Sequence, residues 1–372
     1  MDKELISDVN GYLLERGITL SQRELSNLRD FAIDRDRVGV SVLGWIYTRF
    51  ITFLTPKRGK THSVAPQPKK DPFQQEKDRF SGLSNYYGGL YRGAFVLNYL
   101  MSAAAVFVAL IPYGFSFEKY FGRDAYRHEG VFIALELLII TVIMLIYFVG
   151  ATPYRDKHHK HSFRFMNRRW HERWIEYRTL SEQFRYANLL YLIGLNPLHE
   201  GAAQNAQLKD WTNAYLAYRL SQADPKPMES LTDYKDYLSS LMSDQILYHQ
   251  NNTLRSRHIY KKLHTIGFVM FYGTLVTCAV HFIWHSPVLT LLSGALPAVG
   301  AAMHGILASG EFSKSADISE GMSTQIADQL SQLSFATDVQ TVRAIAKQFH
   351  DTVINEVLGW KVMFEDKNVP LA

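Results

Sequence analysis

The sequence predicts an all-α integral membrane protein with four transmembrane helices in two hairpins and with long cytoplasmic helices. The main observation is residues 263–310, a run of 48 residues without Asp, Glu, Lys or Arg. At about 1.5 Å per residue, a helical run of this length is enough for two crossings of a roughly 30 Å hydrocarbon core. A second pair of apolar segments, about 93–117 and 131–153, is separated by a short loop. Polar segments with helical spacing flank both pairs.

The composition of the 372-residue chain narrows the classes of protein to consider. Cys278 is the single cysteine, so the sequence offers neither a disulfide framework nor a cysteine zinc site. The basic residues behind the net charge of +5 cluster beside the apolar segments. This placement indicates membrane orientation and no direct binding of nucleic acid. Because the first residues are charged, we expect no signal peptide and insertion directed by the internal spans.

Residues 1–55 are predicted to form a small helical module. Ser21 and Glu24 have the spacing of a capping box, which is expected to begin the second helix. Residues 38–54 are apolar but short and contain Arg49. We interpret them as a buried or interfacial helix, and a fifth membrane segment is the alternative. Residues 56–72, rich in Lys, Pro and Gly, are predicted to be a flexible basic linker.

The rest of the chain divides into four segments. These are a first hairpin at 73–154, a helical segment at 155–262, a second hairpin at 263–310 and C-terminal helices at 311–372. Lys and Arg are concentrated before the first span, after the second and before the third. Because basic residues favour the cytoplasmic side, we expect a multi-pass membrane protein. Both termini and the middle segment are then cytoplasmic, and both hairpin tips face outward.

Three polar residues inside the predicted spans are candidates for lining a pore or for coupling. Glu136 is the one acidic residue well inside a span, where a carboxylate is costly. Pairing with Lys119 or Arg127 near the outer end is the simpler role. His281 and His304 lie in the second hairpin, and His304 could line a gate. Its span also carries small residues spaced for close helix packing, namely Gly294, Ala298, Ala301 and Gly305.

An aromatic stripe interleaved with charges follows the first hairpin. It consists of Trp170, Arg173, Trp174, Tyr177, Arg178 and Glu182. The simplest interpretation is an amphipathic helix with ion pairs along a solvated face. The alternative is a surface for an inner partner or for a second copy of the chain.

The histidines His158, His159 and His161 suggest a metal site, but their Arg-rich surroundings beside a span are more typical of contact with lipid headgroups or anions. The sequence contains no Walker loop, Rossmann fingerprint, nucleophile elbow or HExxH motif. It therefore predicts no cofactor, no metal and no enzyme activity.

Several motifs resemble those of one group of bacterial membrane proteins. They are residues 170–178 and 181–185, 245–249, 295–302, 310–312 and 359–364. Over about 80–370 the chain resembles SLOG-associated tandem-hairpin membrane proteins. It is similar in style to the SLATT domains, which are two-span effector modules of bacterial conflict systems. The N-terminal 55 residues depart from this pattern because a Gly-rich nucleotide site is absent. The resemblance implies a defence effector at the inner membrane, with sensing by a separate protein or through the helical module as an adaptor.

Three functions fit these patterns. The first is an effector of anti-phage or stress defence that oligomerises and perturbs the membrane or forms a pore. Its expected partners are the lipid bilayer, further copies of the chain, and a soluble sensor or effector protein encoded nearby. The second is a non-catalytic membrane anchor or scaffold that recruits a soluble partner. The third is an ion channel or transporter component.

Overall fold

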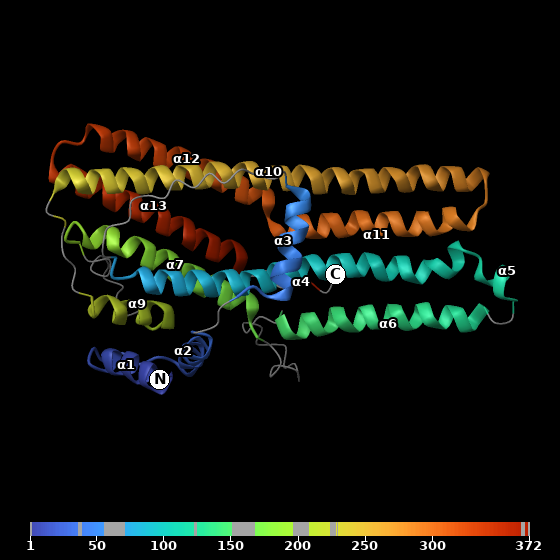
Figure 1. Ribbon diagram of the computed structural model, residues 1–372, viewed down its shortest axis with the longest axis horizontal. Helices are drawn as coiled ribbons and strands as arrows, with labels where there is room; N and C mark the ends of the chain where they lie inside the picture. Colours follow the sequence, from blue (N-terminus) through green and yellow to red (C-terminus); the bar gives the residue numbers. More distant parts are fainter. Residues whose placement is uncertain are drawn as a thin grey trace.

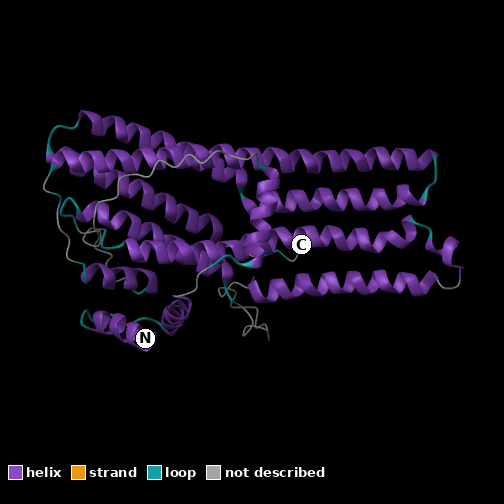
Figure 2. Cartoon of the chain, in the orientation of Figure 1, coloured by secondary structure: helices purple, strands orange, loops and turns teal. Residues whose placement is uncertain are grey.

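The computed structural model describes residues 2–35, 39–55, 71–122, 125–150, 168–195, 208–223, 228, 230–365 and 369–370. These ranges contain helices and no β-strand, so the all-α prediction is confirmed for this part of the chain (Figure 2). Most of the predicted linker, residues 56–70, lies outside the described residues. The same holds for the histidine cluster at 158–161.

The molecule is elongated, and its helices fall into two halves (Figure 1). The N-terminal helices are α1 (Asp2–Leu14), α2 (Gln22–Asp34) and α3 (Val42–Leu54). They are followed by α4 (Gln74–Gly114), α5 (Phe117–Phe121), α6 (Ala125–Gly150), α7 (Trp170–Tyr191) and α9 (Trp211–Ser221). The chain ends with α10 (Leu231–Ile283), α11 (Pro287–Gly310), α12 (Phe312–Phe335) and α13 (Val339–Glu365).

Four helices of the described chain are long and apolar enough to cross a membrane, in agreement with the predicted number of spans. Their apolar parts come from α4, α6, α10 and α11 and lie together in one half (Figure 1). Contacts join these helices in the order α6, α4, α11, α10. The four helices therefore form a row, with α6 and α10 at its two ends.

The turn between α10 and α11 follows from the local sequence. Ser286 has extended backbone and precedes Pro287, which occupies the first turn of α11. Proline fixes φ near a helical value and lacks an N–H, so it begins a helix readily but cannot continue one. The run of 48 uncharged residues is therefore divided close to its middle into two antiparallel helices (Figure 1).

The second half of the molecule has an aromatic core that includes the N-terminal helices. Phe31 of α2 stacks on Phe80 of α4 with ring centroids 4.9 Å apart, and Phe80 stacks on Phe184 of α7 at 5.7 Å. Two ion pairs reinforce this contact. Arg173 lies 2.7 Å from Asp34, and Arg169 lies 2.8 Å from Asp30. The N-terminal module is thus joined to α4 and α7 by a shared core.

Helix α3 lies across α4 at the boundary between the halves and reaches α10 (Figure 1). Its 13 residues span about 20 Å, which is too short for a fifth crossing of a roughly 30 Å core. Trp45 and Phe53 are exposed on α3, and Arg49 lies over the Trp45 ring at 5.4 Å. An exposed aromatic beside a cation is typical of the headgroup region of a bilayer, which favours an interfacial helix.

Close approach of α3 to α4 depends on glycine. A Cβ atom on Gly93 would lie 2.0 Å from the backbone oxygen of Leu43, and one on Gly89 would lie 2.9 Å from the Cα of Gly44. The two backbones therefore touch, as they do in membrane helices that carry small residues four positions apart.

We predict opposite effects for two glycine substitutions in α4. Gly93→Ala should lower the melting temperature of the detergent-purified protein, because the added methyl collides with the α3 backbone. Gly82→Ala is the matched control, since a Cβ there meets nothing within 4 Å. It should stabilise the protein by about 0.5–1 kcal/mol, the usual gain in a helix interior. Equal melting temperatures for the two variants would contradict the close α3–α4 contact.

Candidate functional site: a cavity at the junction of the two halves

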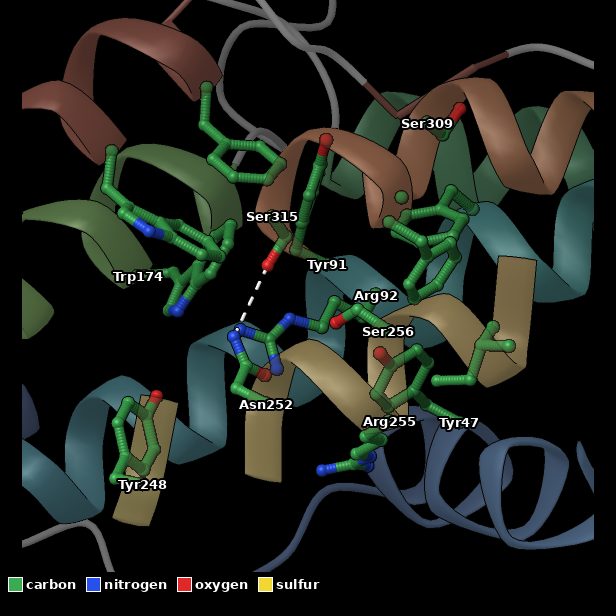
Figure 3. A pocket seen from close by; sticks show the side chains of 16 residues that line it. Tyr47, Tyr91, Arg92, Trp174, Tyr248, Asn252, Arg255, Ser256, Ser309 and Ser315 are labelled. Atoms are coloured by element: carbon green, nitrogen blue, oxygen red, sulfur yellow. Dashed lines mark hydrogen bonds between the residues drawn. The ribbon is translucent and has the colours of Figure 1, made fainter. Parts of the chain in front are cut away.

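The described structure contains a cavity where the polar and apolar halves meet (Figure 3). It has two adjoining lobes of about 200 and 300 Å³. The lobes share five lining residues, which are Arg92, Trp174, Tyr248, Asn252 and Trp360. These come from α4, α7, α10 and α13, so the site joins four helices that are distant in the sequence.

Helix α10 contributes one continuous face to the first lobe. Tyr248, Asn252, Arg255, Ser256 and Ile259 recur at intervals of three or four residues and all line it. This spacing places them on one side of a helix. The Asn252 amide donates to the Ser315 hydroxyl at 3.4 Å, as the dashed line in Figure 3 marks, and to the Ser319 hydroxyl at 2.8 Å. These bonds hold α10 against α12.

Trp174 lines both lobes and belongs to the buried core. Its indole stacks on Tyr91 at 5.5 Å and meets the edge of Phe364 at 5.3 Å. The Arg92 guanidinium lies over the same indole, 4.6 Å from its centroid. Gly88 makes room for this ring, since a Cβ there would lie 2.8 Å from it.

The second lobe contains a carboxyl group that titrates near neutrality. Burial raises the pKa of Glu356 to about 7, against the opposing attraction of Arg178. The Trp360 side chain opposes this rise in pKa as well. Arg178 itself forms an ion pair with Glu182 at 2.7 Å. Nearby, His249 is 1% exposed, and burial lowers its pKa to about 4.

The aromatic stripe lies mainly inside the fold. The sequence suggested a surface for a partner or a second copy, but Trp170, Trp174, Tyr177 and Glu182 are buried against helices of the same chain. The hydroxyl of Tyr177 donates to Asp34 at 3.1 Å. Arg173 binds Asp34 as well, and Arg178 reaches the second lobe of the cavity. The charges between the aromatic residues therefore bind other helices and line the cavity.

The small residues of α11 face α4 in part. A Cβ on Gly305 would meet the Tyr99 ring at 2.2 Å, and one on Gly294 would meet Leu110 at 2.5 Å. Ala298 packs against the main core, whereas Ala301 is exposed. Of the predicted small residues, Gly294 and Gly305 therefore lie in the close contact between α11 and α4, and Ala301 does not.

The polar residues of the spans are distributed over different places. His304 is exposed and lies against Phe271 and His264 of α10, with ring centroids 6.0 and 5.9 Å away. His281 lies near the tip turn, 5.3 Å from the ring of His285. Glu136 is half-buried on α6. The structure does not bring the three predicted polar residues together.

Sequence reasoning missed most of the cavity. Arg92 and Arg255 contributed only to the charge count beside the spans, Tyr248 only to the motif at 245–249, and Tyr91 and Asn252 were not singled out. The sequence does mark parts of the cavity. Tyr91 and Arg92 end the polar part of α4, and Trp360 belongs to the motif at 359–364. Their meeting point depends on how α7 and α13 pack on α4 and α10.

No protein-family model, curated protein or solved structure matches the chain. Within the described ranges, no group of three or more His, Cys, Asp or Glu is placed to hold a metal ion. We take the junction cavity as the candidate site, because charged and aromatic side chains from four helices meet in it.

We predict that Glu356 makes the protein less stable as pH rises. Its folded pKa of about 7 lies above the ordinary value of 4.5, so the folded state keeps a proton that the unfolded state has lost. For one such group, raising the pH from 6 to 8 costs about 1 kcal/mol of unfolding free energy. Thermal unfolding in detergent at both pH values measures the effect.

Glu356→Gln should remove this contribution, so its unfolding free energy should change by about 1 kcal/mol less in the unfavourable direction than that of the parent protein between pH 6 and 8. Glu176, whose pKa burial raises to about 7, and His249, whose pKa burial lowers to about 4, contribute equally to both proteins. Glu320→Gln is the control, since Glu320 is exposed and pairs with Arg257 outside the cavity. Unchanged pH dependence in Glu356→Gln would show that this carboxyl group does not titrate in the fold.

Proposed function

We propose that this chain is an inner-membrane effector of bacterial defence that perturbs or opens the membrane when its cytoplasmic half is triggered. In this arrangement the four apolar helices form two transmembrane hairpins, and both termini are cytoplasmic. The four apolar helices and the basic residues at their polar ends support this orientation. We propose no catalytic step for the chain.

The continuity of α4 and α10 through the junction supports coupling between the halves. These helices have 41 and 53 residues, and each runs from the polar half into the apolar half without interruption (Figure 1). An unbroken α-helix is stiff along its axis because each turn is hydrogen-bonded to the next. A shift of α7 or α13 on the polar half therefore changes the tilt of α4 and α10 within the apolar row.

The four apolar helices form a row with two free ends, which supports association between copies of the chain. On α6 a broad set of large apolar side chains is exposed, among them Val131, Ile133, Leu135, Leu137, Leu138 and Leu145. In a bilayer these side chains contact lipid or another helix. A row with α6 and α10 at opposite ends does not close a channel within one chain, so pore formation requires several copies.

The assignment to defence rests on the resemblance of the motifs to SLOG-associated and SLATT-type proteins. Under this proposal a soluble sensor or effector encoded nearby supplies the trigger, and copies of the chain assemble in the bilayer. A scaffold that recruits a soluble partner is the second candidate. It is favoured by Leu14 and Ile33, apolar residues of the N-terminal module that are 63% and 68% exposed.

We predict that the chain, expressed with its genomic neighbours, protects cells from phage and depolarises the membrane after infection. A two-glycine insertion between Lys262 and Leu263 should abolish depolarisation, because it interrupts α10 at the junction. The same insertion between Trp284 and His285, in the tip turn, should leave it intact. A voltage-sensitive dye reports depolarisation, and the amount of protein in the membrane fraction controls for folding.

Depolarisation that persists with the junction insertion would contradict the coupling. Protection without depolarisation, lost in Leu14→Ser or Ile33→Ser, would favour the scaffold. Protein that remains in the supernatant without detergent would contradict both functions.

A further inference from the structure

The first lobe of the junction cavity is cationic and rich in hydrogen-bond donors. Sixteen residues line it, including Arg92 and Arg255, and none of them is Asp or Glu. Tyr47, Tyr91, Tyr248 and three serines also line the lobe, as do Trp174 and Trp360. Such a lining disfavours cations and favours an anion with several acceptor oxygens.

Aromatic rings position the Arg92 guanidinium for binding an anion. Its guanidinium is half-buried and lies over Trp174 at 4.6 Å and over Tyr47 at 5.8 Å. Stacking uses the faces of the guanidinium and leaves its N–H groups at the edge available. Within the described residues, neither Arg92 nor Arg255 forms an ion pair with a carboxylate. A half-buried cation without a counter-ion is costly, and a bound anion removes that cost.

A second observation points to a missing partner. Tyr91 is 1% exposed, and its hydroxyl has no hydrogen-bond partner in the described structure. Buried hydroxyl groups are nearly always satisfied. Tyr91 and Arg92 both line the first lobe, but the Tyr91 hydroxyl extends away from the Arg92 guanidinium (Figure 3), so a second acceptor group of a bound ligand would satisfy it.

The second lobe suits the organic part of the same ligand. It adjoins the first lobe through Arg92, Trp174, Tyr248, Asn252 and Trp360. Three of these shared residues are aromatic and offer faces for a planar or sugar-like group. The volumes of about 200 and 300 Å³ admit a molecule of modest size whose charge sits in one lobe and whose body sits in the other.

We propose that this cavity binds a phosphate ester, with the phosphate held by Arg92 and Arg255 and the attached group covered by Trp174 and Trp360. Its source is either a soluble ester or the headgroup of an anionic phospholipid. The second source is relevant because Arg92 is the last charged residue before the apolar part of α4, at the expected level of the inner leaflet. This inference takes only the orientation of the helices from the proposed function. It adds the chemical class of a ligand that could act as the trigger.

Binding would couple the two halves. The first lobe is lined by α3, α4 and α11 near the apolar half and by α7, α10, α12 and α13 on the polar side. A phosphate that draws Arg92 of α4 and Arg255 of α10 together changes the relation between the two continuous helices.

Thermal unfolding of the full chain in a neutral detergent tests the proposal with three probes. These are inorganic phosphate, adenosine monophosphate, and phosphatidylglycerol compared with phosphatidylcholine. Chloride at equal ionic strength is the reference for the soluble probes. We expect saturable stabilisation by at least one probe. Adenosine monophosphate identifies a soluble ester as the source, phosphatidylglycerol without adenosine monophosphate identifies a lipid headgroup, and inorganic phosphate reports the phosphate subsite that both share.

Arg92→Gln should weaken the effective probe roughly 10- to 100-fold, as expected for loss of a charged hydrogen-bonding partner. Arg255→Gln should weaken it less, because Arg255 is exposed at the edge of the lobe. Arg257→Gln is the matched control on the same helix, since its side chain pairs with Glu320 at 2.6 Å outside the cavity.

The proposal is overturned if no probe stabilises the protein beyond its reference, or if Arg92→Gln and Arg255→Gln bind as well as Arg257→Gln. If Arg92→Gln fails to fold, the comparison of Arg255→Gln with Arg257→Gln still decides. Binding without membrane depolarisation in cells would support the ligand site while contradicting the proposed function, so the two can fail independently.

Discussion

Two helices, α4 and α10, each run without a break from the polar half into the apolar half, where the helices are long and apolar enough to cross a membrane. In their apolar parts, a bilayer offers the backbone no hydrogen-bond partners, so every N–H and C=O group must be satisfied within the helix. In their polar parts, the same helices carry the aromatic and charged side chains of the second half. The other elements are arranged around this pair: α6 and α11 complete the apolar row, and α7, α12 and α13 cover the polar parts.

The closest backbone contacts and the stacking of Arg92 on Trp174 lie at the junction between the two halves. Glycines allow α3 to lie against α4, and Arg92, which stacks on Trp174, directly precedes the uncharged residues 93–117. The cavity forms there because Trp174 and Trp360 reach the junction from α7 and α13, while α10 contributes a polar face. A ligand in this position contacts both continuous helices, which makes the junction a suitable place for a trigger to act on the apolar row.

Buried ion pairs fix the N-terminal helices to this frame. Asp34 of α2 is 1% exposed and binds Arg173, Tyr87 and Tyr177. Removing one member would leave the others charged or polar in a buried site, which is usually more costly than the pair itself is favourable. The contact therefore makes the register of α2 on α4 and α7 specific and joins the N-terminal module directly to α7.

The sequence by itself determined the helical class, the number of apolar helices and the place of the tip turn, because hydrophobic length, helical period and proline chemistry are local properties. The shortness of 38–54 likewise indicated a buried or interfacial helix. Tertiary structure decided that the stripe from Trp170 to Glu182 is mainly internal, since a helix pattern shows which side is apolar but not what covers it. It also decided the cavity, because Arg92, Asn252 and Trp360 come together only through the packing of α4, α10 and α13.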